Sequence, residues 1–190
     1  MTATIVRSTD YRLLAFDPGL SNTGWVSCHW QAPILTVDHG GVFHPNQTVG
    51  HKEFREERSR YGARLLTLAC LRQTITELQQ RYQPDYWVAE NAFYNRFRPS
   101  AYSALLQWLT ITAWCLREQA QQPLYRIPPK LVKRIAASDG TSSKLSVQEA
   151  VTTHPQIRLL TDTTDFAEHT YDAIAIAYTF TQLTELPAQE

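Results

Sequence analysis

Short apolar runs, some alternating with polar residues and some continuous, predict the strands of one central sheet. The first run ends in an acid and is followed by Pro-Gly and Ser-Asn, which are turn-forming residues. The next two runs are rich in Val, Thr and aromatic residues and suggest an antiparallel meander. The predicted strands are residues 12–17, 23–30, 34–43, 86–89 and 124–127.

Apolar positions spaced three or four residues apart predict the helices. Leu65, Leu71 and Ile75 belong to one such stripe, and Pro84 ends it because the residue before proline disfavours helical geometry. The last helix is apolar on every side around residues 173–177 and is therefore expected to be largely buried. The polar residues 45–57 are expected to form a loop. The predicted helices are residues 64–82, 99–121, 130–137, 144–153 and 169–183.

This order of elements predicts one α/β domain, residues 1–190 with a core of about 11–184, in which helices flank a mixed five-stranded sheet. No apolar stretch approaches the roughly 20 residues of a membrane helix, and the start lacks a signal- or transit-peptide pattern. We therefore expect a cytoplasmic protein without membrane contact. Cys28, Cys70 and Cys115 are widely spaced without a CxxC pair, so we expect buried reduced thiols.

The charge of the chain is balanced, with 18 basic and 18 acidic residues. A neutral total argues mildly against a nucleic-acid binder, because phosphate contacts usually come from a basic surface. The distribution is uneven: no Lys or Arg follows Arg158, whereas basic residues cluster at 52–64, 96–98 and 126–144. An acidic metal centre flanked by basic strips would give this pattern, and so would an ordinary solvated surface.

Three carboxylates stand out by their location at the ends of apolar segments. Asp17 and Glu90 each end a predicted strand, and Asp172 precedes the apolar part of the last helix. An acid beside a buried segment is costly unless it is paired or bound to a cation, and carboxylates are the usual ligands of hard divalent cations. Each acid alone has another explanation: a turn for Asp17, an exposed strand end for Glu90, or a favourable helix-dipole contact for Asp172.

Four ordered segments resemble the motifs of the RuvC family of Holliday-junction resolvases, which are nucleases of the RNase H-like class acting in DNA recombination and repair. Residues 14–24 (LAFDPGLSNTG) resemble the first motif, and residues 83–93 (QPDYWVAENAF) the second. Residues 132–144 are similar to the basic third region, and residues 169–177 (HTYDAIAIA) to the closing motif. One Asp-Pro-Gly would be weak evidence, but four motifs in order form a specific pattern.

The resemblance implies that Asp17, Glu90 and Asp172 bind two Mg²⁺ ions, for which Mn²⁺ can substitute. His169 lies three residues before Asp172, so a helix would place both on one face. His169 would then ligate a metal or act at the scissile phosphate as a further catalytic residue. Taken alone, it would be a partly exposed residue at a helix N-terminus.

The resemblance also implies contacts with branched DNA. Lys133 and Lys144 would neutralise phosphate charge, although isolated lysines are most often solvated. Phe93 would stack on a base at the branch point or anchor its loop. The loop around it interleaves rings and positive charges, which suits either unpaired bases or a dimer contact. Its other members are Tyr94, Arg96, Phe97 and Arg98.

One helix departs from the family pattern, because Leu106 and Trp108 stand where small residues around a Gly-Gln pair are usual. We expect its packing to change and, if it forms the dimer interface as in the family, the spacing of the two active sites to differ. A homodimer is still expected, since symmetric cutting of a four-way junction needs a two-fold axis. The departure suggests a divergent, phage-type member of the family. A phage-encoded protein would act in the cytoplasm of the host.

The predicted function is resolution of four-way DNA junctions by metal-dependent hydrolysis, with symmetric nicks that leave 5′-phosphate and 3′-hydroxyl ends. The alternatives are a nuclease with broader branched-DNA or RNA–DNA hybrid specificity, and a catalytically silent DNA-binding module. The silent module is disfavoured because all three acids are present. An actin-like ATPase needs two domains and a second phosphate motif, for which 190 residues leave no room.

Overall fold

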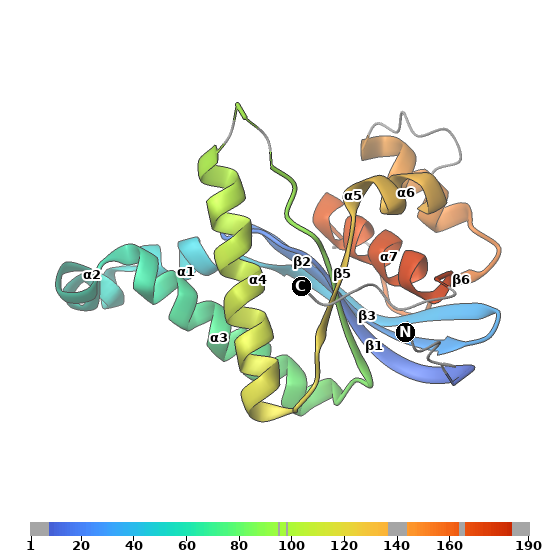
Figure 1. The fold of residues 1–190 in the computed structure, drawn as a ribbon, viewed down its shortest axis with the longest axis horizontal. Helices are drawn as coiled ribbons and strands as arrows, with labels where there is room; N and C mark the ends of the chain where they lie inside the picture. Colours follow the sequence, from blue (N-terminus) through green and yellow to red (C-terminus); the bar gives the residue numbers. More distant parts are fainter. Residues whose placement is uncertain (1–7, 95, 98, 137–143, 164–165, 184–190) are drawn as a thin grey trace, which may run out of the picture.

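A mixed six-stranded sheet runs through the centre of the protein, with helices on both faces (Figure 1). The computed structural model describes residues 8–94, 96–97, 99–136, 144–163 and 166–183. The strand order is β5-β4-β1-β2-β3-β6. The strands are β1 (Asp10–Asp17), β2 (Thr23–Gln31), β3 (Ile34–Phe43), β4 (Tyr86–Glu90), β5 (Leu124–Ile127) and β6 (Ile157–Leu159).

The pairing confirms the predicted N-terminal meander, because β1, β2 and β3 pair antiparallel in sequence order. β4 pairs parallel with β1, and β5 pairs parallel with β4. The expectation of five strands was wrong: β6 pairs parallel with β3 through Leu35 and Val37. This strand is only three residues long, which is too short to show an alternating pattern. It is a strand because it pairs with the neighbouring β3.

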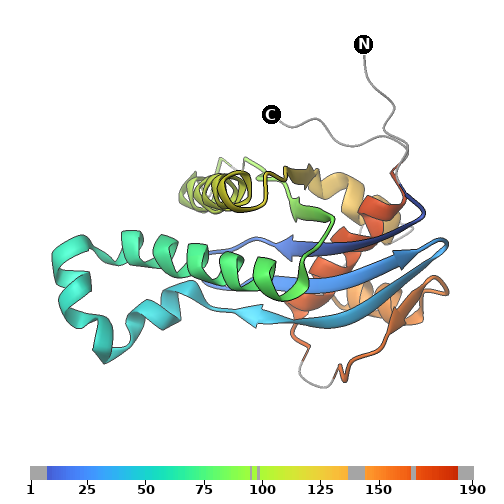
Figure 2. The ribbon, with the colours of Figure 1, turned by 90° about the horizontal axis from the view of Figure 1, so that it is seen from below.

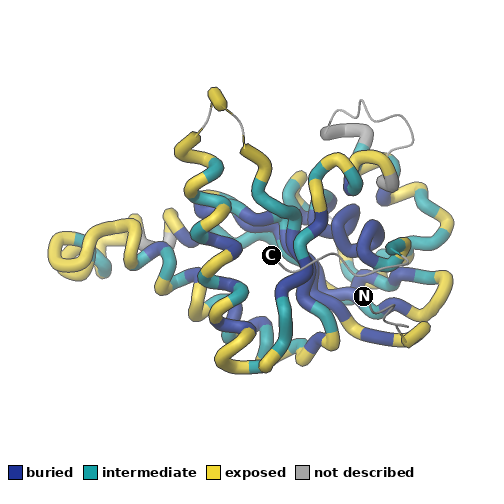
Figure 3. The backbone as a smooth tube through the Cα atoms, in the orientation of Figure 1, coloured by how far each residue is buried: buried dark blue, intermediate teal, exposed yellow. Residues whose placement is uncertain are grey.

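The expectation of a loop at residues 45–57 was also wrong, because short helical turns fill this region. They project from the body of the protein and expose most of their side chains (Figures 2 and 3). A polar, solvated turn has no apolar stripe, which explains why its sequence gave no helical signal. The helices are α1 (Pro45–Gly50), η1 (Lys52–Phe54), α2 (Arg55–Tyr61), α3 (Ala63–Tyr82), α4 (Pro99–Gln119), α5 (Pro129–Ala136), α6 (Lys144–Thr153) and α7 (Glu168–Thr181).

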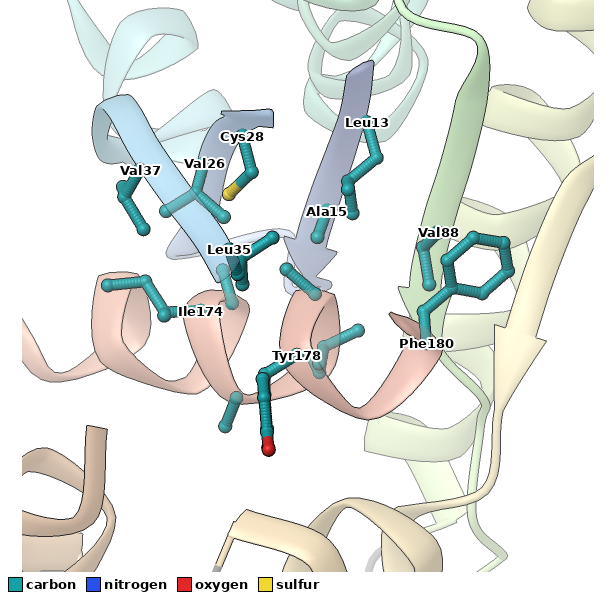
Figure 4. Packing of buried hydrophobic residues seen from close by; sticks show 14 of the residues in the cluster. Leu13, Ala15, Val26, Cys28, Leu35, Val37, Val88, Ile174, Tyr178 and Phe180 are labelled. Carbon is teal, nitrogen blue, oxygen red and sulfur yellow. The ribbon is translucent and has the colours of Figure 1, made fainter. Parts of the chain in front are cut away.

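β1 is buried on both of its faces, which accounts for its continuous apolar sequence. Leu13 and Ala15 belong to the core shared with α7, whereas Leu14 and Phe16 belong to the core shared with α3 and α4. Figure 4 shows the first core, where strand residues such as Leu13 and Ala15 lie over α7. The sheet therefore holds β1 rigidly between two helical layers, and Asp17 is its last residue.

Some side chains lie differently from the expected apolar faces. Leu65 and Trp114 are 55% and 53% exposed. All three cysteines are free thiols; Cys28 and Cys115 are buried as expected, and Cys70 is half-buried. Among the described residues, no helix combines the length and apolar character that crossing a bilayer requires.

Candidate metal centre

The register of β1 and β4 brings two of the predicted acids to the same edge of the sheet. The parallel pairing matches Phe16 with Ala89, so Asp17 and Glu90 are the next residues on the two neighbouring strands. Glu90 pairs in turn with Ile127 of β5. Since parallel strands end at one edge, both carboxylates leave the sheet on the same side.

The first turn of α7 brings His169 and Asp172 to this edge. Gly24 of β2 lies opposite Asp17, and a Cβ built on it would be 1.9 Å from the backbone oxygen of His169. The missing side chain at Gly24 therefore allows the backbone of α7 to approach β2 closely. The glycine at position 24 is thus a packing requirement of the site.

Asp17, His169 and Asp172 form a cluster suited to a metal ion. One ligand atom of each residue lies within 4.8 Å of the others, and all three residues are half-buried. The His169 Nδ1 atom is 2.6 Å from Asp17 Oδ2. The predicted placement of His169 and Asp172 on one helix face is therefore what the structure shows. Glu90 is outside this group of three but interacts electrostatically with Asp17 and Asp172.

The charges of the site interact strongly. Burial, followed by the carboxylates of Asp17 and Asp172, raises the pKa of Glu90 to about 7, while Lys133 opposes the shift. The hydrogen bond to Asp17 raises the pKa of His169, against the effect of burial. Three carboxylates close together are mutually repulsive, and a divalent cation would offset that repulsion. The donor set therefore fits a hard cation such as Mg²⁺.

Comparison with known proteins shows which proteins this chain resembles. No model of a known protein family matches the chain. The crossover junction endodeoxyribonuclease RuvC of Azorhizobium caulinodans is 27% identical over 168 residues, 88% of each chain. RuvC of T. thermophilus, solved in complex with Holliday junction substrate, has a TM-score of 0.71 at 20% identity and covers 94% of this chain and 99% of its own. The yeast mitochondrial Holliday junction resolvase Ydc2 has a TM-score of 0.63 at 14% identity and covers 93% of this chain and 78% of its own.

The chain is similar to RuvC in sequence and in fold. The sequence relative and the structural neighbours agree over nearly the whole length, and the mixed sheet with flanking helices is the RNase H-like fold expected from the motifs.

The structure describes only some of the basic residues that were predicted to bind DNA. Lys133 is exposed in the last turn of α5 and close enough to lower the pKa of Glu90, so it belongs to the electrostatic surroundings of the acids. Lys144 is the first residue of α6, and its side chain lies outside the described part of the chain. Arg98 also lies outside the described residues.

The segment between β4 and α4 displays aromatic rings at the surface. Phe93, Tyr94 and Phe97 are 60%, 59% and 77% exposed. Tyr94 packs edge-on against Tyr102 of α4, and the guanidinium of Arg96 lies 4.6 Å from the centre of the Phe97 ring. The exposure of Phe93 disfavours a purely anchoring role, and its stacking on a base stays a prediction.

Trp108 holds the loop that follows Asp17, a role that the sequence did not indicate. It is fully buried, its ring packs 5.5 Å from that of Phe16, and its Nε1–H donates to Thr23 Oγ1 at 3.1 Å. The Thr23 hydroxyl in turn donates to the carbonyl of Gly19. The expectation that Leu106 and Trp108 change the packing of this helix relative to the family stays a prediction. Trp108, Thr112 and Cys115 follow one another at spacings of four and three residues, which is the pattern of one buried helix face.

Two further residues contact the centre without any sequence signal. Asn22 lies between His169 and His44, with its Nδ2 atom 3.4 Å from His169 Nε2 and its Oδ1 atom 2.9 Å from His44 Nδ1. Asn22 and His169 are 147 positions apart, so only the folded chain reveals their contact.

Proposed function

We propose that this RuvC-like protein is an endonuclease that resolves four-way DNA junctions by metal-dependent phosphodiester hydrolysis. The observation that carries the proposal is the cluster of Asp17, His169 and Asp172 beside Glu90, whose pKa is raised to about 7. The names of the similar proteins support the choice of substrate, since they include a crossover junction endodeoxyribonuclease and a Holliday junction resolvase.

The three acids Asp17, Glu90 and Asp172 are assigned to two Mg²⁺ ions, with Mn²⁺ as a substitute, and His169 is assigned a role beside them. Bound Mg²⁺ would supply activation of a water and stabilisation of the leaving oxygen. The water oxygen would bond to phosphorus while the bond from phosphorus to the 3′ oxygen breaks, which leaves 5′-phosphate and 3′-hydroxyl ends. Asp17 and Asp172, which have ligand atoms within 4.8 Å of one another, would supply carboxylate oxygens, and Glu90 would add a third from β4. His169 orients Asp17 through the hydrogen bond from its Nδ1 atom.

The DNA would be held by groups on both sides of this centre. Lys133 is positioned to meet a phosphate near Glu90. The assignment of Lys144 and Arg98 to other phosphates rests on the resemblance to the RuvC family alone. The exposed rings of Phe93 and Tyr94, with Arg96 beside them, suit bases that are unstacked at a branch point. Two copies of the protein are required for paired nicks, so a homodimer is part of the proposal. The proposed location is the cytoplasm, which would be that of the host if a phage encodes the chain.

The deciding experiment compares cleavage of a mobile four-way junction, a flap, a Y-fork, a plain duplex and an RNA–DNA hybrid, with Mg²⁺ and with EDTA. Asp17→Asn and Glu90→Gln should abolish cutting and retain junction binding. Glu77→Gln is the matched control, because this exposed acid on α3 lies outside the site and bonds only to Gln73 among the contacts described. Cleavage that persists in both site variants would refute the metal assignment.

The substrate panel also separates the alternatives. Equal cutting of junction and linear duplex would leave a nuclease without junction preference. Preferred cutting of the hybrid would indicate an RNA-directed activity. Junction binding without cutting under any metal would indicate a silent binding module.

A further inference from the structure

A line of hydrogen-bonded side chains extends from the proposed metal centre into the neighbouring loop. Asp17 Oδ2 lies 2.6 Å from His169 Nδ1, and His169 Nε2 lies 3.4 Å from Asn22 Nδ2. Asn22 Oδ1 lies 2.9 Å from His44 Nδ1. Both ring nitrogens of His169 are therefore engaged by protein groups.

The direction of these hydrogen bonds is set at His44. Its Nδ1 atom also lies 3.3 Å from the backbone carbonyl of Ser21, which can only accept. Nδ1 of His44 must therefore carry a hydrogen, and it faces the oxygen of the Asn22 amide. This leaves the amino group of Asn22 toward His169, and an amino group can only donate. His169 Nε2 must accept, so the neutral ring of His169 carries its proton on Nδ1 and donates it to Asp17.

The far end of the line is anchored by neighbouring elements. Asn46 of α1 donates from Nδ2 to Ser21 Oγ at 3.2 Å, and its backbone N–H donates to the carbonyl of Leu20. Thr67 of α3 donates to Asn46 Oδ1 at 3.0 Å. The loop that holds Asn22 is thus fixed to two helices, which restricts the movement of its amide.

We infer that Asn22 and His44 are positioning residues that fix the orientation and tautomer of His169, so that His169 presents an N–H to Asp17. The expected effect of these residues on cleavage rests on the proposed nuclease function. The polarity of the hydrogen bonds is independent of that function and can be measured in the metal-free protein.

The first test reads the proton positions directly. Long-range ¹H–¹⁵N correlation spectra of metal-free protein with labelled histidine, at alkaline pH, distinguish protonated from unprotonated ring nitrogens. His169→Gln identifies the signals of His169. The expected result is a protonated Nδ1 and an unprotonated Nε2. In Asn22→Asp the new carboxylate can only accept a hydrogen bond, so His169 Nε2 should carry a proton in this variant. An Nε2 that is protonated in the wild type, or unaffected in Asn22→Asp, would overturn the inference.

The second test measures single-turnover cleavage and junction affinity separately. Asn22→Leu keeps the approximate shape and removes both hydrogen bonds, so the cleavage rate should fall by about 10–100-fold with unchanged junction affinity, as for other groups that orient metal-site residues. His44→Asn retains a donor near the Nδ1 position and should stay within a few-fold of wild type, whereas His44→Leu should resemble Asn22→Leu. Equal loss in the two His44 variants, with each shown to be folded by thermal unfolding, would overturn the role of His44.

The two tests fail independently. A wild-type protein that cuts no substrate would refute the nuclease proposal, while the spectra would still decide the hydrogen-bond polarity. Normal cleavage in Asn22→Leu would refute the positioning role and leave the nuclease proposal intact.

Discussion

Glu90 occupies a position where a negative charge is unfavourable. Burial and the neighbouring Asp17 and Asp172 raise its pKa from 4.5 to about 7. The folded protein therefore binds this proton more tightly than the unfolded chain does. In the metal-free protein, stability is expected to decline as the pH rises from about 4.5 to about 7, because the unfolded chain loses the Glu90 proton in that interval while the folded protein still holds it.

Glu90→Gln should remove this pH dependence. The variant should gain stability relative to the wild type between pH 4.5 and pH 8, by up to about 3 kcal/mol, because one pKa unit corresponds to about 1.4 kcal/mol. Denaturant unfolding in EDTA at the two pH values measures the difference, with Glu77→Gln as the control on an exposed acid. A stability difference between variant and wild type that is the same at both pH values would contradict the prediction.

A second residue-scale prediction concerns the contact between β2 and α7. Gly24→Ala places a methyl group 1.9 Å from the His169 carbonyl oxygen and 2.3 Å from its carbon, and neither backbone atom can rotate away. We expect a loss of about 3 kcal/mol or more, the upper range for overpacking, together with a displaced His169.

Gly50→Ala is the matched control for Gly24→Ala, since nothing lies within 4 Å of the added methyl group at the end of α1. It should leave the free energy of unfolding nearly unchanged. Similar losses in the two variants would show that steric contact with α7 is not the cause.

At the scale of elements, α4 has two different faces. Trp108 points into the core and holds the Thr23 hydroxyl, whereas Leu106 and Trp114 are 38% and 53% exposed. The helix thus braces the loop after Asp17 with one side and presents apolar surface with the other.

Trp108→Phe tests the inward face. It keeps an aromatic ring and removes the N–H that donates to Thr23, so stability should fall by about 1–3 kcal/mol. Trp114→Phe makes the same change at an exposed position of the same helix and should shift stability by about 0.5 kcal/mol or less. Thermal or denaturant unfolding gives both values. An equal effect at the two positions would argue against a specific role for the indole hydrogen bond.

The elements also show which parts of the fold a sequence can reveal. β1 and α7 were predictable because each has a strong apolar pattern of its own. β6 was missed because three residues become a strand only beside β3, and α1 and α2 were missed because they have no buried stripe. The strand ends pointed to Asp17 and Glu90, but the contact of Asn22 with His169 joins positions 147 residues apart and follows only from tertiary packing.

At the scale of the whole molecule, the outward face of α4 is the surface to which we assign the second copy of the chain. Leu106, Thr110 and Trp114 are exposed at four-residue intervals and therefore form one stripe along the helix. In the described structure this stripe lies on the outside of the helical layer formed by α3 and α4.

Leu106→Glu should weaken the proposed dimer by at least about 10-fold in its dissociation constant, because a charge would be buried in an apolar contact. Sedimentation or light scattering over a concentration series measures the change. Leu160→Glu is the control, since Leu160 is 70% exposed beyond β6 at the opposite edge of the sheet. A Leu106→Glu protein that stays as dimeric as the control would place the interface elsewhere.

The hydrogen bond between Asp17 and His169 joins residues that are 152 positions apart. During synthesis on a ribosome, the strand that holds the first acid emerges long before the helix that supplies the histidine and the last acid. A nascent chain therefore lacks the complete cluster of Asp17, His169 and Asp172 until nearly all of it has been made. Under the proposed nuclease function, the order of the elements delays DNA cleavage until α7 has docked on the sheet.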